Sequence, residues 1–423
     1  MTETKRSPIT LHRVLRALGP GVTTGAADDD PSGVATYSIT GAQLGTSLLW
    51  TAWLTWPLMA ASQLMCARIG MVTGTGLAGA FRSKFPRWVV AMLSLSLLFA
   101  NTINIASDLA GMGDAARLLF GGSTQIYVIV FGVGICVATI RLRYTHIASV
   151  LKWLALALFA YVITAFIVKP DWSVILKVSF TPSLPSGKLA WETLVAILGT
   201  TISPYLFFWQ AGQEVEEEKA MGRILKIYRE GATVDEIVDR RIDVTIGTFF
   251  SNLVMFFIIL TTALTLHLHV ATQNISTTAQ AAEALRPLAG DFAYWLYTLG
   301  IVGTGLLAIP TLAGGAAYAF AETFDWAYGL ENKLRQASSF YGVFILATVG
   351  GIGIDFLGIA PFKALFWTAV INGVLAPFLL IGILLISSDS KIMRGQTSSR
   401  LSVITVVMTT ILMFGAAIGM IVF

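Results

Sequence analysis

Residues 25–33 read Gly-Ala-Ala-Asp-Asp-Asp-Pro-Ser-Gly, and they interrupt an apolar run at about residues 14–44. An aspartate at the centre of a lipid bilayer costs about 2.5–3.5 kcal/mol, so three in succession are not tolerated on a continuous helix that faces lipid. Pro31 stops the helix because it lacks a backbone N–H, and Gly33 permits a turn. Irregular backbone at this depth is tolerated only where it lines a cavity. The stretch therefore predicts a membrane helix that is broken around a polar site.

The composition of the chain places it in the membrane. Of 423 residues, 55% are hydrophobic before the 39 glycines are counted, and only 12% are charged. A soluble domain is about 45–50% apolar with glycine included and about 25% charged. We therefore expect an all-α integral membrane protein and exclude soluble enzymes, nucleic-acid binders and disordered scaffolds. Eleven transmembrane helices are expected from the apolar runs, at about residues 14–44, 47–72, 87–113, 124–140, 147–168, 190–212, 242–266, 291–324, 341–358, 362–387 and 400–422.

A second break matches the first in position. Residues 199–205 read Gly-Thr-Thr-Ile-Ser-Pro-Tyr, inside the sixth run. The first and sixth runs are five apart, so they take corresponding positions in two halves of five helices each. Interrupted segments at matching positions are the best sequence pointer to the substrate site of a transporter.

The whole chain, residues 1–423, is expected to form one membrane transport domain. The two five-helix repeats would cover about residues 14–168 and 190–387, with the helix at about 400–422 outside the repeat. A polar cytoplasmic connector is expected at 213–241, after the broken sixth helix. An ion-attracting vestibule is the alternative interpretation of that connector.

The basic residues predict the orientation of the chain. If the amino terminus is cytoplasmic and the runs alternate, 22 of the 28 Lys and Arg fall on the inner side. This asymmetry is the positive-inside pattern, and it leaves the carboxyl terminus outside. We expect a multi-pass monomer in the plasma membrane (the inner membrane of a bacterium), with lipid around it, no nucleic-acid partner and no cofactor.

The two breaks offer hard oxygen donors. The first presents the Asp30 carboxylate and the free carbonyls that end its half-helix, and Pro204 in the second frees a carbonyl near Thr200 and presents the Ser203 hydroxyl. Such oxygens suit a hard divalent cation. The alternative is that both prolines only kink packed helices while the aspartates face a watery loop. Asp28 and Asp29 are expected to point elsewhere than Asp30.

Three stretches resemble the NRAMP divalent-metal transporters: Gly19-Pro20-Gly21, Asp30-Pro31-Ser32-Gly33-Val34-Ala35-Thr36 and Gly199-Thr200-Thr201-Ile202-Ser203-Pro204-Tyr205. The resemblance implies a LeuT-type fold with two inverted repeats. It also implies that Asp30 is a metal ligand, with the carbonyls of Ala27 and Thr200 as further candidates.

The departures from the family pattern bear on the ion. Gly33 stands in the place of the metal-binding asparagine, Ser203 in the place of the methionine, and Tyr205 in the place of the histidine. A thioether is soft and helps to select manganese, iron or cadmium over magnesium, whereas a hydroxyl does not. The smaller side chains predict a wider and wetter site, which suits Mg²⁺ because that ion dehydrates reluctantly. The pattern resembles an NRAMP-related magnesium transporter branch, with Mn²⁺ also accepted.

Proton coupling is not expected. Histidine is the natural proton carrier near neutral pH, and none of the four histidines falls in the middle of a run: His12, His146, His267 and His269. In the third run Asp108-Leu-Ala-Gly111 keeps the family's aspartate and loses its glutamate. We therefore expect uncoupled alternating access. The alternative is a proton-coupled importer of Mn²⁺ or Fe²⁺, for which Asp108 is the visible piece.

Other side chains are weaker candidates for the cavity, and a packing role stays open for each of them. They are Gly33, Thr201, Tyr205, Gln210, Asn372 and Asp108. Two further functional classes fit the sequence less well. A sodium symporter for an organic solute is disfavoured by the three acidic residues if the solute is a carboxylate. A membrane enzyme lacks a nucleophile–base pair at depth.

Overall fold

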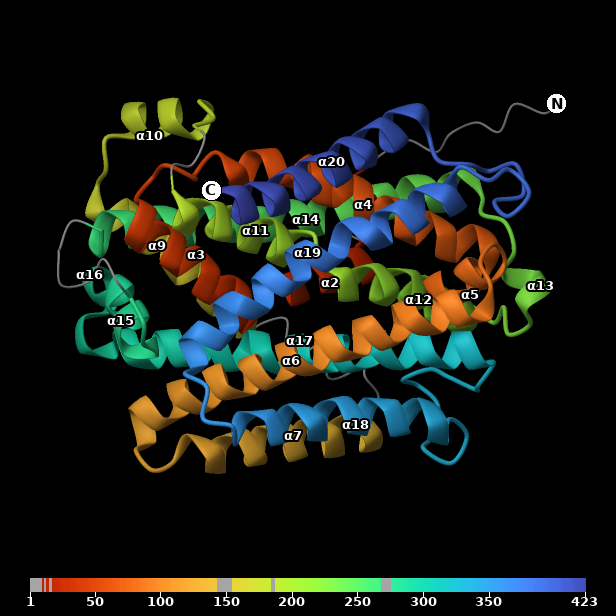
Figure 1. The fold of residues 1–423 in the computed structure, drawn as a ribbon, viewed down its shortest axis with the longest axis horizontal. Helices are drawn as coiled ribbons and strands as arrows, with labels where there is room; N and C mark the ends of the chain where they lie inside the picture. The colour runs from red at the N-terminus through yellow and green to blue at the C-terminus, as the bar shows by residue number, and fades with distance from the viewer. Residues whose placement is uncertain (1–9, 11–12, 15–16, 143–153, 184–186, 268–274) are drawn as a thin grey trace.

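The computed structural model describes residues 10, 13–14, 17–142, 154–183, 187–267 and 275–423, and these form helices and no strand. The helices are α2 (Pro20–Asp28), α3 (Pro31–Leu44), α4 (Thr51–Thr73), α5 (Leu77–Arg82), α6 (Arg87–Phe120), α7 (Thr124–Arg141), η1 (Leu154–Leu158), α9 (Phe159–Val168), α10 (Trp172–Ser179), α11 (Lys188–Thr201), α12 (Pro204–Ala220), α13 (Lys226–Arg229), α14 (Val234–Thr265), α15 (Thr278–Ala282), η2 (Glu283–Leu285), α16 (Arg286–Ala289), η3 (Gly290–Phe292), α17 (Ala293–Phe324), α18 (Ser338–Asp355), α19 (Pro361–Ser387) and α20 (Arg400–Val422). Figure 1 shows their arrangement.

Within the described residues, eight spans are long and apolar enough to cross a membrane. The other three expected crossings correspond to α2 with α3, to α4, and to η1 with α9. Part of the fifth run lies outside the described residues. The all-helical membrane fold is confirmed, but the count of eleven crossings is not.

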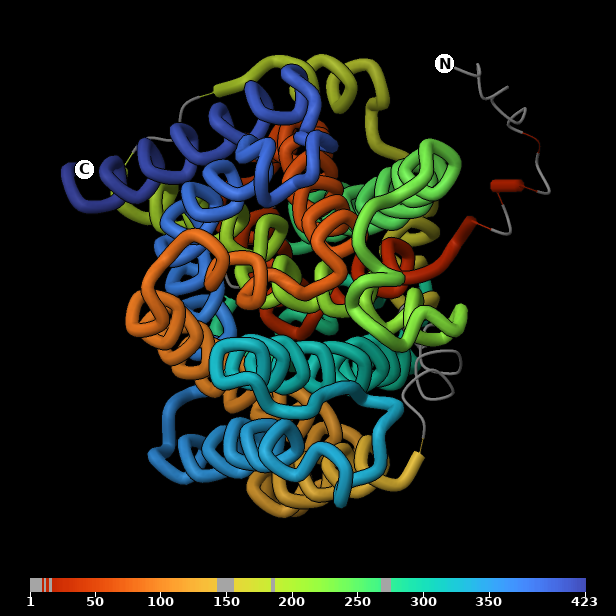
Figure 2. Tube along the Cα trace, turned by 90° about the vertical axis from the view of Figure 1, so that its right-hand side faces the viewer, coloured from red at the N-terminus to blue at the C-terminus, as the bar shows by residue number. Residues whose placement is uncertain are grey.

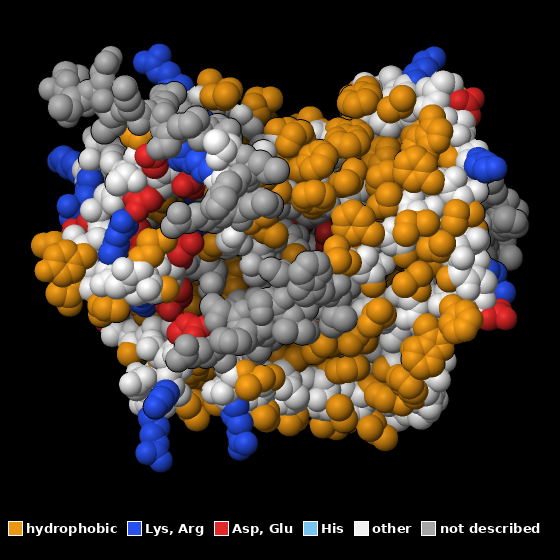
Figure 3. All heavy atoms as spheres, turned by 180° about the vertical axis from the view of Figure 1, so that it is seen from behind, with side chains coloured by type: hydrophobic (Ala, Val, Ile, Leu, Met, Phe, Trp, Pro, Cys, Tyr) orange, Lys and Arg blue, Asp and Glu red, His pale blue; other side chains and the backbone are white. Residues whose placement is uncertain are grey.

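Two groups of long helices organise the bundle. α6, α7, α17 and α18 pack against one another, and Figure 2 shows α7 and α18 together on one side of α17. These are the third and fourth expected helices of each half. The second group contains the two broken helices, α2 with α3 and α11 with α12, and also α14, which packs along both α2 and α3. Apolar side chains cover much of the middle and right of the face seen in Figure 3, and charged side chains lie mostly to their left and at the right-hand edge.

Both breaks occur where the sequence predicts them. α2 ends at Asp28, and α3 begins at Pro31 with Asp30 as its N-cap. α11 ends at Thr201, and α12 begins at Pro204. Proline is favoured at the first position of a helix because the N–H that it lacks would be unpaired there.

Small residues let α14 approach the broken helix closely. A Cβ on Gly21 would lie 2.6 Å from the backbone nitrogen of Val244, and one on Gly25 would collide with the carbonyl of Gly247. Inside a bilayer the hydrophobic driving force between helices is missing, so helices associate through close van der Waals packing, which small residues permit. The contact holds α14 beside the break.

The expected connector at 213–241 is mostly helical. α12 continues to Ala220 and α14 begins at Val234. Several charged side chains are buried in this region because they pair with one another. Arg240 pairs with Glu214 at 2.7 Å, with Asp243 at 2.5 Å and with Glu217.

Asp243 also caps the start of α2. Its carboxylate accepts from the backbone N–H groups of Gly19 (2.8 Å), Gly21 (2.7 Å) and Val22 (3.0 Å). A carboxylate at a helix N-terminus pairs with orphan N–H groups and with the positive end of the helix dipole. We call Arg240, Glu214, Glu217 and Asp243 the Arg240 cluster. It ties α12 and α14 to the first half of the broken helix.

Candidate functional site

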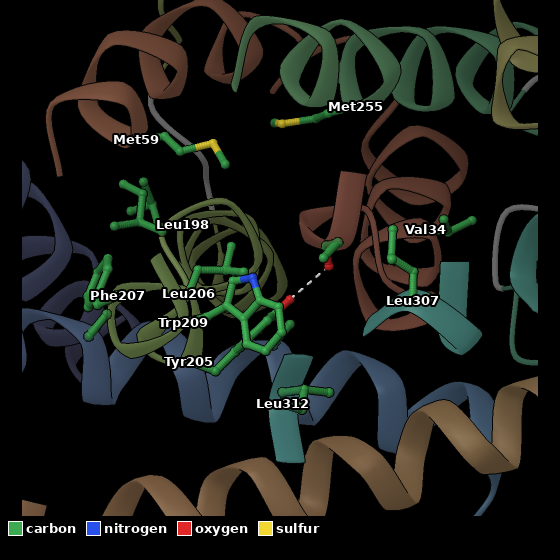
Figure 4. Packing of buried hydrophobic residues seen from close by; sticks show 14 of the residues in the cluster. Val34, Met59, Leu198, Tyr205, Leu206, Phe207, Trp209, Met255, Leu307 and Leu312 are labelled. Carbon is green, nitrogen blue, oxygen red and sulfur yellow. Dashed lines mark hydrogen bonds between the residues drawn. The ribbon is translucent and has the colours of Figure 1, made fainter. Parts of the chain in front are cut away.

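The two breaks meet in the interior. The Tyr205 hydroxyl, on α12, donates to the Ala27 carbonyl on α2 at 3.1 Å. The Thr200 hydroxyl, on α11, donates to the Tyr37 hydroxyl on α3 at 3.1 Å. Figure 4 shows Tyr205 among buried apolar side chains, with its hydrogen bond dashed. Each half of one broken helix is therefore joined to one half of the other.

Asp30 is buried, with 2% of its surface exposed. One oxygen, Oδ1, accepts from the Ser32 hydroxyl at 2.6 Å and from the Gly33 backbone N–H at 2.7 Å. The other, Oδ2, accepts from Nδ2 of Asn104 at 3.1 Å. A carboxylate has about four acceptor positions, and three are occupied. Asp30 can therefore offer a cation one direct bond without losing a partner.

The two expected carbonyls already carry side-chain donors. Ala27 accepts from Tyr205, and Thr200 accepts from the Ser203 hydroxyl at 2.5 Å. The same hydroxyl lies 2.9 Å from the Gly199 carbonyl, so the Ser203 proton is directed back at α11. Each carbonyl keeps one free lone pair.

The remaining candidates divide into two groups. Asp108 and Asn372 reach the site through Asn104. Thr201 donates to the carbonyl of residue 197, one turn back in its own helix, and Gln210 donates to Glu214 of the Arg240 cluster at 2.6 Å. The structure therefore does not bring Thr201 and Gln210 to Asp30.

Asn104 is the site residue that the sequence analysis missed. It is fully buried on α6 and donates to both Asp30 and Asp108. Its spacing of four residues from Asp108, which puts both on one helix face, was the available signal.

Asp28 and Asp29 point away from the partners of Asp30, as expected. The Ser251 hydroxyl on α14 donates to Asp28 at 2.7 Å and lies 3.3 Å from an oxygen of Asp29. Both carboxylates are buried, as are Asp30 and Asp108. No ion pair joins any of these four to a basic side chain in the described part of the chain. Four unpaired carboxylates in a low-dielectric interior attract cations.

Gly33 leaves room beside Asp30. A Cβ there would meet Tyr37 at 3.4 Å, and the Asp28 carbonyl and Asp30 at 3.5 Å, which are ordinary contacts. No three His, Cys, Asp or Glu side chains converge to hold a metal ion anywhere in the described ranges. His267 bonds the carbonyl of Ala42 at 2.8 Å. The other three histidines lie outside the described residues.

Comparison with known proteins identifies the family. The family model described as natural resistance-associated macrophage protein-like (Nramp) matches residues 21–423. The chain is 25% identical over 408 residues to the divalent metal cation transporter MntH of Caldanaerobacter subterraneus, covering 91% of this chain and 88% of that protein. It is 27% identical to the MntH of Yersinia pestis over 324 residues, 74% of each chain.

Solved structures agree on the fold. The crystal structure of the Eremococcus coleocola manganese transporter superposes with a TM-score of 0.72 at 17% identity, over 98% of this chain and 88% of that one. Mhp1, a nucleobase-cation-symport-1 family transporter, gives a TM-score of 0.53 at 16% identity, over 95% and 92%. Both likenesses concern the fold alone. The family match over residues 21–423 shows that the chain belongs to the Nramp family, and the solved structures show that it has the LeuT-type fold.

Proposed function

We propose that this chain carries Mg²⁺ across the plasma membrane as a partly hydrated ion, by uncoupled alternating access, and that Mn²⁺ is also accepted. Because it belongs to the Nramp family, it is a transporter of divalent metal cations and not an enzyme. Membership of the family does not set which ion is carried or whether transport is coupled to protons, and these two points are what we propose.

The hydrogen bonding of Asp30 carries the proposal. Three of the four acceptor positions of this carboxylate are occupied, and the nearby carbonyls of Ala27 and Thr200 each carry a hydroxyl donor. A cation at this site would meet few free protein ligands and would keep most of its water. Mg²⁺ commonly binds through one or two carboxylates and several waters.

The donor set also lacks a soft atom. Ser203 offers a hydroxyl where the family pattern has a thioether, and Gly33 offers space. Without a soft ligand the site has little to favour Mn²⁺ or Fe²⁺ over Mg²⁺. The relatives are named for divalent metal cations or for manganese, so the preference for Mg²⁺ rests on the hydrogen bonding of Asp30 and, second, on these two positions.

The alternative is a proton-coupled importer of Mn²⁺ or Fe²⁺. The names of the relatives and the buried carboxylate of Asp108 favour it. It requires a proton path, which the positions of the histidines do not supply.

We further propose a monomer of two inverted repeats with a cytoplasmic amino terminus. A negative potential inside the cell would drive uptake of the ion, because a divalent cation gains about 4.6 kcal/mol at 100 mV, which is twice the value for one charge. The Arg240 cluster would lie at the cytoplasmic end of the pathway.

Uptake into proteoliposomes tests the proposal. Mg²⁺, Mn²⁺ and Ca²⁺ are supplied side by side with a pH dye inside, and Asp30→Ala is compared with Asp114→Ala. Asp114 is a matched control because it lies on α6, is 9% exposed and pairs with Arg117. We expect Mg²⁺ uptake without acidification, lost in Asp30→Ala and kept in the control. Exclusion of Mg²⁺, or acidification that accompanies metal uptake, would favour the alternative.

A further inference from the structure

Asn104 lies at the centre of a chain of buried polar side chains from three helices. Its Nδ2 is 3.1 Å from Oδ2 of Asp30, the N-cap of α3, and 3.0 Å from Oδ2 of Asp108 on α6. Its Oδ1 accepts from Nδ2 of Asn372 on α19 at 3.0 Å. Asn104 and Asp108 have no exposed surface, and Asp30 and Asn372 have 2%. One amide therefore links the substrate site to two helices of the bundle.

The chemistry of the neighbours determines how this amide is oriented. An ionised carboxylate can only accept hydrogen bonds, and a side-chain amide has two N–H bonds on its nitrogen. Both N–H bonds of Asn104 are therefore used, one on each carboxylate. Asn372 donates to the opposite end, so a reversed Asn104 would turn its one oxygen toward both carboxylates and its NH₂ group toward the NH₂ group of Asn372.

This arrangement limits what Asp30 can give to a cation. The bond from Asn104 takes one of the two acceptor positions on Oδ2, and Ser32 and Gly33 take both positions on Oδ1. The same amide holds one oxygen of Asp108, which would otherwise be a second carboxylate for the ion. The other oxygen, Oδ1 of Asp108, is buried and has no hydrogen-bond partner.

We propose that Asn104 is a positioning residue that keeps Asp30 a weak, single-bond ligand and thereby keeps the transported ion hydrated and quickly released. This inference rests on the proposed function. Removing the amide frees an acceptor position on Asp30 and takes away the side chain that donates to both buried carboxylates. A cation stabilises carboxylates that have lost a donor, so both effects strengthen metal binding.

The effect should differ between ions. Mn²⁺ gives up water more readily than Mg²⁺, which dehydrates reluctantly. In Asn104→Ala we expect the Kd for Mn²⁺ to fall by about tenfold, which is opposite in direction to the 10–100-fold weakening that usually follows the loss of a hydrogen-bond partner of a metal ligand. The Kd for Mg²⁺ should fall less, and saturated uptake of both ions should slow because release becomes harder.

Asn101 supplies a matched control. It is one turn earlier on α6, fully buried, and donates to the Leu312 carbonyl at 2.8 Å instead of to Asp30 or Asp108. Asn101→Ala should leave the ratio of the two Kd values unchanged. Asn372→Leu removes the bond that orients Asn104 and should shift that ratio in the same direction but by less. It also supplies the test if Asn104→Ala does not fold.

Isothermal titration with Mg²⁺ and with Mn²⁺, together with proteoliposome uptake, measures these quantities. Tighter Mn²⁺ binding and slower uptake in Asn104→Ala and Asn372→Leu, but not in Asn101→Ala, would support the inference. If binding depends on Asp30 while the Asn104 and Asn372 variants bind both ions like the control or more weakly, the inference alone is wrong. If Asp30→Ala binds Mg²⁺ as the wild type does, the proposed function itself is wrong.

Discussion

Replacing Arg240 with methionine should strongly destabilise the folded protein. The Arg240 side chain is 10% exposed, and two of its partners, Glu214 and Asp243, are 1% and 0% exposed. Removing one member of a buried ion pair costs about 3–5 kcal/mol, because the charge that remains is uncompensated. Asp243 keeps its three backbone donors, whereas Glu214 keeps only the amide of Gln210. We therefore expect the free energy of unfolding to fall by about 3–5 kcal/mol, mostly because the Glu214 carboxylate loses its charged partner.

A second variant tests this role of Glu214. Adding Glu214→Gln to Arg240→Met removes the stranded charge, and the new amide can still bond Gln210, so most of the lost stability should return. Arg117→Met is the control, since that side chain is 49% exposed in its pair with Asp114 and such pairs contribute about 0–1 kcal/mol.

The free energy of unfolding is measured by titrating denaturing detergent into mixed micelles and following tryptophan fluorescence. A loss in Arg240→Met no larger than that in Arg117→Met would refute the reasoning. So would a double variant as unstable as the single one.

Three further changes have definite outcomes. Gly33→Asn with Ser203→Met should lower Mg²⁺ uptake and keep or improve Cd²⁺ and Mn²⁺ binding, because it adds an amide and a soft donor. Unchanged ion selectivity in titrations would contradict the inference that Gly33 and Ser203 set the choice of ion. Tyr205→Phe should lower the Kd for Mn²⁺, because the Ala27 carbonyl that the Tyr205 hydroxyl caps is freed as a ligand. An unchanged Kd would count against that carbonyl as a ligand. Gly41→Ala should destabilise the fold by about 1–3 kcal/mol, as overpacking does, because its Cβ would collide with α14. Gly134→Ala is the control, since a Cβ there meets nothing within 4 Å. Equal melting temperatures for the two variants would contradict the expected collision with α14.

Much of the fold follows from local sequence. Pro31 and Pro204 each begin a half-helix, and Asp30 caps one of them, because proline position and capping depend on a few adjacent residues. The order of the apolar runs likewise predicts the order of the long helices. The ends of α12 and α14 were missed because their charged residues look solvated in sequence, yet they are buried by pairing within the Arg240 cluster.

The candidate site was predictable only in part. Asp30, Ala27, Thr200 and Ser203 were predicted from the two breaks as metal ligands, and Tyr205 as a weaker candidate. The structure bonds Tyr205 to Ala27 and Thr200 to Tyr37, and it directs the Ser203 hydroxyl back at α11. Asn104 was not predicted, because its role arises from a contact with Asp30, which is 74 positions away in the chain. Such a contact depends on how α6 packs, which no local pattern specifies.

Counting the water molecules on a bound metal ion shows whether the site holds a partly hydrated ion at Asp30. Mn²⁺ can replace Mg²⁺ as a paramagnetic probe, and pulsed electron–nuclear double resonance in heavy water counts the waters on it. We predict that Mn²⁺ in the wild-type protein keeps several waters, and that the signal is lost in Asp30→Ala and kept in Asp114→Ala. A Mn²⁺ ion held without water, or a hydrated one that is unaffected by Asp30→Ala, would contradict this prediction.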